Sequence, residues 1–207
     1  MKLKWLFLVV GLIFLQSCNT TQITASWRDS EYQARTYKKI LVLAVTQNLE
    51  ARQFFEQAVV DALQRKNINA IKSLEEFSPG FQPQEGEGEK VANDLRQKGY
   101  DGVITLGLLD VKEETRYNPG NEYYKPESYY DPFYGYYVRT YNKTYEPGYY
   151  SGTMNVYLES NLYDLDLGEL IWTAQSETTD PTNYGDFAST YANVLIKDMM
   201  AENLFAQ

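Results

Sequence analysis

The segment KKILVLAVTQNLEARQFFEQAVVDALQRKN, residues 38–67, carries the pattern that decides the fold. Its apolar run ILVLAV, residues 40–45, is rich in β-branched side chains and bounded by polar residues, which is typical of a buried strand. The residues that follow repeat apolar side chains at helical spacing, and Asn48 stands where a helix cap is expected. A buried strand that leads directly into an amphipathic helix predicts a βαβ start with a right-handed crossover.

The predicted helix has one apolar stripe and one polar face. The stripe consists of Phe55, Ala58, Val59, Ala62 and Leu63. The residues expected to face away from it are Glu56, Gln57, Asp61, Gln64 and Arg65.

The rest of the chain predicts a mixed sheet around this unit. Further elements are expected at residues 68–74 (strand), 87–98 (helix), 103–117 (strand), 154–163 and 170–178 (a hairpin around the turn DLDLGE) and 184–204 (helix). Two parallel crossovers followed by an antiparallel hairpin predict an α/β fold, in the order β-α-β-α-β-insertion-β-β-α, with helices packed on a mixed sheet.

The first 18 residues, MKLKWLFLVVGLIFLQSC, have the order of a bacterial secretion signal. Lys2 and Lys4 precede an apolar run that is shorter than the roughly 20 residues of a transmembrane helix. The end, LQSC, resembles the lipobox of bacterial lipoproteins, in which the cysteine becomes the lipidated first residue. A plain signal peptide or an N-terminal anchor with an incidental cysteine is the alternative, but Cys18 is the chain's only cysteine and falls at the required position.

The lipobox resemblance and the expected element order together predict three regions: a signal peptide at 1–17, a lipidated tether at 18–25 and a single α/β domain at 26–207 with a tyrosine-rich insertion at 117–150. Without the signal peptide the chain has 17 basic and 28 acidic residues, a net charge of −11. Asn19 follows the cysteine where lipoproteins retained in the inner membrane would have Asp. We therefore expect attachment to the bacterial outer membrane, with the domain facing the periplasm.

The amino-acid composition excludes several kinds of catalytic and metal site and argues against one class of partner. Histidine is absent and Cys18 is the sole thiol, so the commonest general base and cysteine-based zinc sites are excluded. A net charge of −9 argues against nucleic acid as a partner. The acidic stretch 164–169 faintly resembles a calcium loop, but its interleaved leucines and flanking strands favour a hairpin turn. We expect no enzyme activity, no cofactor and no metal site.

Trp172 and Trp27 are expected in different environments. Trp172 lies inside a predicted strand and is expected in the core. Trp27 precedes the first predicted strand and is interpreted as a residue that covers the edge of the core, with a ligand-stacking role as the alternative.

The stretch YYDPFYGYY, residues 129–137, lies in a tyrosine-rich segment, 117–150, that holds twelve of the 19 tyrosines. Loops of this length are usually functional or disordered, yet disordered segments are poor in aromatic residues. Tyrosine is enriched at interfaces because it offers a large rigid contact area and a hydroxyl. A β-hairpin with an aromatic face, a loop that orders on a partner, glycan or peptidoglycan, and a lid over the sheet all remain open. The candidate binding residues are Tyr123, Tyr124, Tyr129, Tyr130, Phe133, Tyr134, Tyr136, Tyr137, Tyr141, Tyr145, Tyr149 and Tyr150.

Three segments of the chain resemble a widespread group of bacterial lipoproteins: ITASWRDSEYQARTYKKILVLAVTQNLEARQFFEQAVVDAL (23–63), KGYDGVITLGLLD (98–110) and LYDLDLGELIWTAQS (162–176). That group is similar to the α/β domain of the TolB N-terminus, of CsgG and of LpoB-type activators of penicillin-binding proteins. The resemblance covers most of 23–205 except the tyrosine-rich segment, and it brings no catalytic residue. It implies an adaptor in cell-envelope assembly or maintenance that binds an envelope protein or itself. The alternative is a peptidoglycan or carbohydrate binder that uses the tyrosines as stacking platforms.

Overall fold

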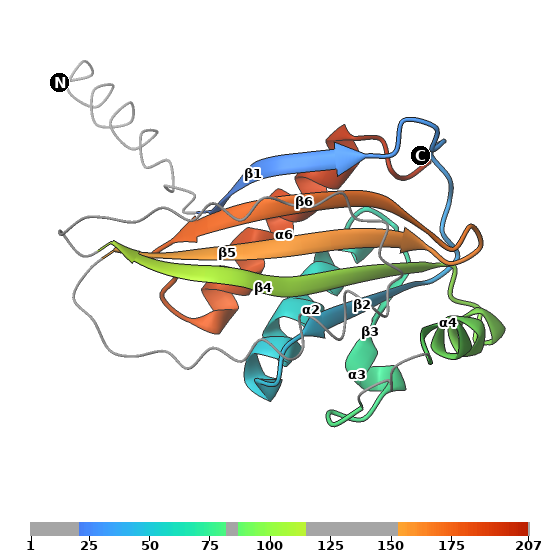
Figure 1. Ribbon diagram of the computed structural model, residues 1–207, viewed down its shortest axis with the longest axis horizontal. Coiled ribbons are helices and arrows are strands. Elements are labelled where there is room, and N and C mark those ends of the chain that lie inside the picture. The colour runs from blue at the N-terminus through green and yellow to red at the C-terminus, as the bar shows by residue number, and fades with distance from the viewer. Residues whose placement is uncertain (1–20, 82–86, 115–152, 207) are drawn as a thin grey trace, which may run out of the picture.

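The sheet of this protein is mixed, as the sequence predicts. The computed structural model describes residues 21–81, 87–114 and 153–206. Along the chain the elements are β1 (Thr21–Arg28), β2 (Ile40–Val45), α2 (Leu49–Gln64), β3 (Ala70–Lys72), α3 (Ser73–Glu76), α4 (Gly88–Gln97), β4 (Gly102–Glu114), β5 (Thr153–Asp164), β6 (Glu169–Thr179) and α6 (Tyr184–Ala201). The strands form one sheet in the order β1-β6-β5-β4-β2-β3 (Figure 1). β2 pairs in parallel with β3 and β4, and the other neighbours are antiparallel, so the predicted α/β fold is confirmed.

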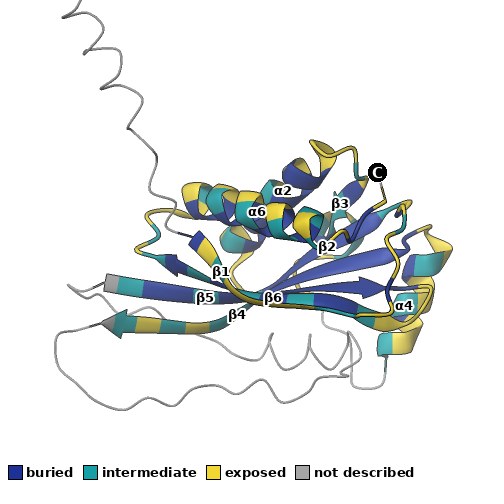
Figure 2. Cartoon of the chain, turned by 90° about the horizontal axis from the view of Figure 1, so that it is seen from above, coloured by how far each residue is buried: buried dark blue, intermediate teal, exposed yellow. Residues whose placement is uncertain are grey.

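The helices α2 and α6 pack side by side on one face of the sheet (Figure 2). Phe55 of α2 makes edge and tilted ring contacts with Phe187 and Tyr191 of α6, at centroid distances of 4.9 and 5.5 Å. Trp172 of β6 is completely buried in the same core, as the sequence predicts. This apolar layer holds the helices on the sheet, because each large buried side chain contributes roughly 1.5–3 kcal/mol.

A second, smaller core lies on the opposite face, where α4 covers one end of the sheet. Alternate residues of β2 divide between the two cores, because successive side chains of a strand point to opposite faces. Val42 belongs to the core under α2 and α6, whereas Leu41 belongs to the second one. The second core consists of Leu41, Val91, Leu95, Tyr100, Val103, Tyr163 and Leu165.

The helix α2 starts at its predicted cap but buries more than its predicted stripe. The side chain of Asn48 accepts a hydrogen bond from the backbone N–H of Ala51 at 3.0 Å. Glu56, expected to face away from the core, is completely buried, so that prediction is wrong. It lies one turn after Arg52, which is also buried, and the two side chains form an ion pair at 2.9 Å. The pair neutralises two charges that helical spacing alone would have left in solvent.

The strand β1 corrects the expected tether. Residues 21–25 were expected in the segment 18–25, yet the chain pairs with β6 from Thr21 onward. The segment is polar and mostly exposed, so its own pattern does not predict a strand; the ladder with β6 supplies the missing hydrogen bonds. Trp27 lies opposite Thr173, on the face away from α2 and α6, and is 46% exposed, so it does not cover the core edge.

The stretch 164–169 forms the predicted hairpin turn between β5 and β6. The carboxylate of Asp164 accepts hydrogen bonds from the backbone N–H groups of Asp166 and Leu167, at 2.9 and 3.0 Å. Gly168 has a φ of +75°, a conformation that favours glycine. The turn prediction is therefore confirmed.

Candidate functional site

All the site residues that the sequence predicts lie outside the described residues. These are Cys18 and the aromatic residues Tyr123, Tyr124, Tyr129, Tyr130, Phe133, Tyr134, Tyr136, Tyr137, Tyr141, Tyr145, Tyr149 and Tyr150. The structure does describe the strand that follows Cys18 and the strand ends on either side of the tyrosine-rich segment.

The tyrosine-rich segment departs from the paired ends of two long strands. β4 and β5 pair from Gly102 opposite Asp164 to Glu114 opposite Thr153, with one register shift between Leu108 and Asp110. Because Glu114 and Thr153 are direct partners, the two ends of residues 115–152 start about 5 Å apart. Among the described residues, the ladder ends at this pair.

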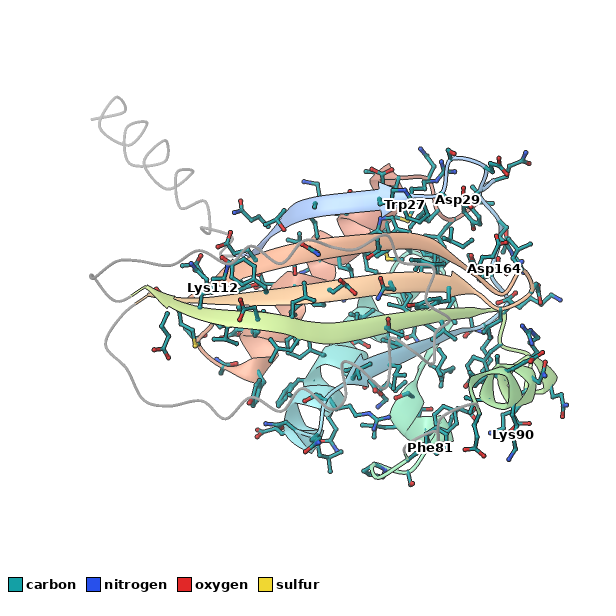
Figure 3. All side chains as sticks on the ribbon, in the orientation of Figure 1. Trp27, Asp29, Phe81, Lys90, Lys112 and Asp164 are labelled. Atoms are coloured by element: carbon teal, nitrogen blue, oxygen red, sulfur yellow. The ribbon has the colours of Figure 1, made fainter. Side chains whose placement is uncertain are left out.

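Contacts between three strands hold this end of the sheet. The ammonium of Lys112, labelled in Figure 3, lies 5.0 Å from the ring centroid of Tyr157. The hydroxyl of Tyr157 donates to the carboxylate of Glu177 on β6 at 2.8 Å. Asp180, just after β6, accepts from the backbone N–H of Met154 at 2.6 Å and donates its own N–H to the Met154 carbonyl at 2.7 Å. Side-chain contacts as well as the backbone ladder therefore hold the ends of β4 and β5, next to the segment, in the sheet.

The first described residue lies at the same end of the sheet. Thr21 is opposite Thr178, and their hydroxyls form a buried hydrogen bond of 2.8 Å. Asn155 of β5 is opposite Thr179, one residue further along β6. Three strand spacings, about 15 Å, separate β1 from β4 across the sheet, and the end of β4 lies three residues, about 10 Å, further along the strands than Thr21. Figure 1 shows β1 entering the sheet where β4 and β6 end.

A completely buried polar cluster joins α2 to β2 and α3. Arg52 Nε donates to Glu56 Oε1 at 2.9 Å, and Arg52 Nη2 donates to Ser73 Oγ at 2.7 Å. The Glu56 carboxylate also accepts from Ser73 Oγ at 2.5 Å and from the N–H groups of Ala44 and Leu74 at 3.2 and 3.1 Å. Every charge in this cluster is paired inside the protein, which is typical of a structural element.

A second cluster lies at the other end of the sheet and centres on Arg35. Its guanidinium contacts the carboxylates of Asp164, Asp166 and Asp101 at 2.9, 2.7 and 3.3 Å. Burial lowers the pKa of Arg35, but the hydrogen bond to Asp166 and the charges of Asp164 and Asp166 raise that pKa overall. Burial has the opposite effect on Tyr37 and raises the pKa of its hydroxyl, which donates a hydrogen bond to the Asp164 carboxylate at 3.3 Å. Asp101 accepts the backbone N–H groups of residues 38 and 39, so the cluster clamps the chain before β2 to the β5–β6 turn.

A hollow of about 360 Å³ lies beside α4, lined by Phe77, Asp94, Leu95, Gln97 and Lys98. Phe77 stacks on Phe81 with ring centroids 4.3 Å apart. Lys98 binds Glu76 at 2.8 Å, and Glu76 accepts the Tyr100 hydroxyl at 2.7 Å. These contacts hold α3 against α4.

Two further findings bear on the chemistry of the chain. The described part of the chain contains no group of three or more acidic, histidine or cysteine side chains arranged to hold a metal ion. Within residues 21–81, 87–114 and 153–206, no helix has the length and apolar character needed to span a membrane.

Comparisons with known proteins identify similar structures only. No protein-family model matches the sequence, and no curated protein matches it. The chain is similar to PelC from a dodecamer of Paraburkholderia phytofirmans, with 14% identity, a TM-score of 0.46 and coverage of 90% of this chain and 98% of that chain. It is also similar to the lipoprotein GNA1162 from Neisseria meningitidis, with 12% identity, a TM-score of 0.41 and coverage of 79% and 96%.

Sequence reasoning missed both charge clusters, the buried one at Arg52 and the partly exposed one at Arg35. Arg52 and Glu56 have the spacing of a helical ion pair, and that spacing is the one signal that could have linked them. Arg35 and its carboxylate partners lie up to 131 residues apart in the sequence, so no local pattern connects them.

Proposed function

We propose that this protein is a lipid-anchored binding domain that serves as an adaptor in cell-envelope assembly or maintenance. In this proposal the acyl chains on Cys18 anchor the protein in the outer membrane, and the domain faces the periplasm. Its activity is binding and not catalysis. The partner is an envelope protein or a second copy of the chain, and the tyrosine-rich segment 117–150 is the surface that recognises it.

One observation carries the proposal: Glu114 pairs directly with Thr153, so the chain leaves β4 for the segment and returns to β5 at neighbouring points of the sheet. A long insertion between two paired strands that holds twelve tyrosines supports a role in recognition. The end of β4, from which the chain leaves the sheet, lies roughly 18 Å from the start of β1. That start is three residues after Cys18, so the strand ends that adjoin the segment and the first described residue after Cys18 lie at one end of the sheet.

Site-specific photocrosslinking tests the proposal in intact envelopes. A photoreactive phenylalanine analogue replaces Tyr134, and the same analogue replaces Lys66 as a control on an exposed site after α2. We expect crosslinked protein products at position 134, absent at position 66. Retention of the protein on purified peptidoglycan, without protein products at 134, would contradict the adaptor role and favour the carbohydrate binder.

Two variants complete the test. Deletion of residues 118–149, with a short turn joining the ends, is expected to leave the fold intact because Glu114 and Thr153 already pair. The deletion variant should lose the partner, and normal folding with full partner binding would contradict the role of the segment. Cys18→Ser should release the protein from the membrane fraction, and continued attachment would contradict lipid anchoring.

A further inference from the structure

Exposed apolar side chains gather at the N-terminal ends of α2 and α6. Leu49 and Phe54 of α2 are each 43% exposed, and Tyr184 of α6 is 38% exposed. We call these three residues the apolar patch. Asn48 Nδ2 donates to the Tyr184 hydroxyl at 3.0 Å, which ties the start of α6 to the start of α2. A Cβ on Gly185 would lie 3.5 Å from Phe54 Cε1, so the Phe54 ring lies against the first turn of α6.

Packing in the core does not explain why these three exposed positions carry apolar side chains. The contact between α2 and α6 is filled by the neighbouring Phe55, which packs on Phe187 and Tyr191. Phe54 lies on the exposed side of α2, beside Gln53 and Gln57, which are both exposed. Phe54 therefore contacts the first turn of α6 with part of its ring and leaves 43% of its surface exposed to water.

The apolar patch lies at the end of the domain where the chain enters. Tyr184 follows Thr178 by six residues, and Thr178 is the direct partner of Thr21. Figure 1 shows α6 beginning, and β1 entering the sheet, at the same end. Cys18 precedes Thr21 by three residues, which reach at most about 10 Å when extended. An acylated Cys18 therefore holds Thr21, at the start of β1, within about 10 Å of the lipid surface.

We propose that the apolar patch docks onto the surface of the lipid bilayer that holds the acylated Cys18. This inference rests on the proposed lipid anchor and adds the orientation of the domain on the membrane. Two aromatic rings and a leucine at the water–lipid boundary are the side chains that interfaces of membranes favour. Three side chains bury far less than the roughly 1,200 Å² of a stable protein interface, but they suffice to orient a domain that is already tethered.

Two carboxylates near the patch determine which lipid headgroups favour docking. Glu50 and Asp186, both exposed, occupy the first turns of α2 and α6. Anionic headgroups repel these carboxylates, so docking is expected on zwitterionic lipid and is weakened by anionic lipid.

Fluorescent labelling in vesicles tests the orientation. In the acylated protein Cys18 is blocked, so Phe54→Cys or Leu167→Cys introduces a single reactive thiol for an environment-sensitive dye. Leu167 is the matched control, because it is an exposed apolar residue, 58% exposed, in the turn at the far end of the sheet. The full-length proteins are reconstituted into vesicles of phosphatidylethanolamine and phosphatidylcholine with bromine atoms on the acyl chains.

We expect the dye at position 54 to gain about three-fold or more in emission and to be quenched by the brominated chains. The dye at position 167 should remain in water, because it lies about 35 Å along the sheet from the start of β1. Adding anionic lipid should reduce the quenching at position 54.

Two outcomes at position 54 contradict the inference. A dye at position 54 that remains in water overturns the inference. A signal at position 54 that grows with protein density, without quenching by the lipid, also overturns it and indicates contact with a second copy. Mass spectrometry of each reconstituted protein distinguishes these failures from failure of the anchor, since an unmodified Cys18 would contradict the proposed function itself.

Discussion

Thr21 and Thr178 lie opposite each other at the end of the β1–β6 ladder, and their hydroxyl oxygens form a buried hydrogen bond of 2.8 Å. This contact fixes the chain to the sheet three residues after Cys18. A lipid anchor at that cysteine would therefore act on a rigid domain through a very short connection.

Thr21→Val is expected to lower the free energy of unfolding by about 1–2 kcal/mol, because it leaves the buried Thr178 hydroxyl without its partner. Replacing both threonines with valine should cost less than the sum of the single changes, since no unpaired hydroxyl then remains. Urea unfolding of the three variants gives this coupling. Additive effects would show that the two hydroxyls do not depend on each other.

Glu56→Gln is expected to destabilise the protein by about 3 kcal/mol, because it leaves the buried Arg52 guanidinium without a counter-charge. Thermal or urea unfolding measures the change. Asp61→Asn on the same helix is the control: Asp61 is exposed and binds Gln57, so its replacement should change stability by less than about 0.5 kcal/mol. Equal effects of the two changes would contradict the structural role of the buried cluster.

The contribution of Glu76 to stability should depend on pH. Hydrogen bonds from Lys98 and Tyr100 lower the pKa of Glu76 in the folded protein. Its contribution is therefore present above its ordinary unfolded pKa of about 4.3 and is lost as pH falls through the folded value. Glu76→Gln should cost about 0.5 kcal/mol at pH 7, a small value because solvent screens the ion pair, and nothing at pH 2. A cost that does not change with pH would contradict this assignment.

Asp198 should behave in the opposite sense. Burial and the nearby charge of Glu202 raise the pKa of Asp198, although the indole of Trp172 lowers it in part. Within the described residues neither Asp198 Oδ2 nor Trp172 Nε1 completes a hydrogen bond. Because the folded pKa is raised, the stabilising contribution of the protonated acid is fully present below the unfolded pKa and is lost as pH rises through the folded one.

Asp198→Asn is therefore expected to raise the free energy of unfolding at pH 7, by about 0.5 kcal/mol after allowance for solvent screening. The gain should vanish below about pH 3, where the wild-type acid is protonated. Unfolding measured across this range checks the sign, and destabilisation by Asp198→Asn at pH 7 would show that the ionised form is the favoured one.

Local patterns predicted most of the sheet and its helices. The run 40–45, the cap at Asn48 and the turn at Gly168 each depend on residues that are close in sequence, so periodicity and turn chemistry suffice to identify them. The same patterns failed at Glu56, because helical spacing alone could not show that Arg52 would neutralise it inside the core.

The sequence by itself determined the α/β class, the hairpin between β5 and β6, the motif at Cys18 and the position of the tyrosine-rich segment along the chain. Only the tertiary structure decided that polar residues from Thr21 onward form an edge strand, because the hydrogen bonds that stabilise β1 come from β6, about 150 residues away. The tertiary structure also decided that the start of β1, the paired residues Glu114 and Thr153 next to the tyrosine-rich segment, and the apolar patch lie at one end of the domain. That arrangement follows from strand order and direction, which pair residues that no local pattern connects.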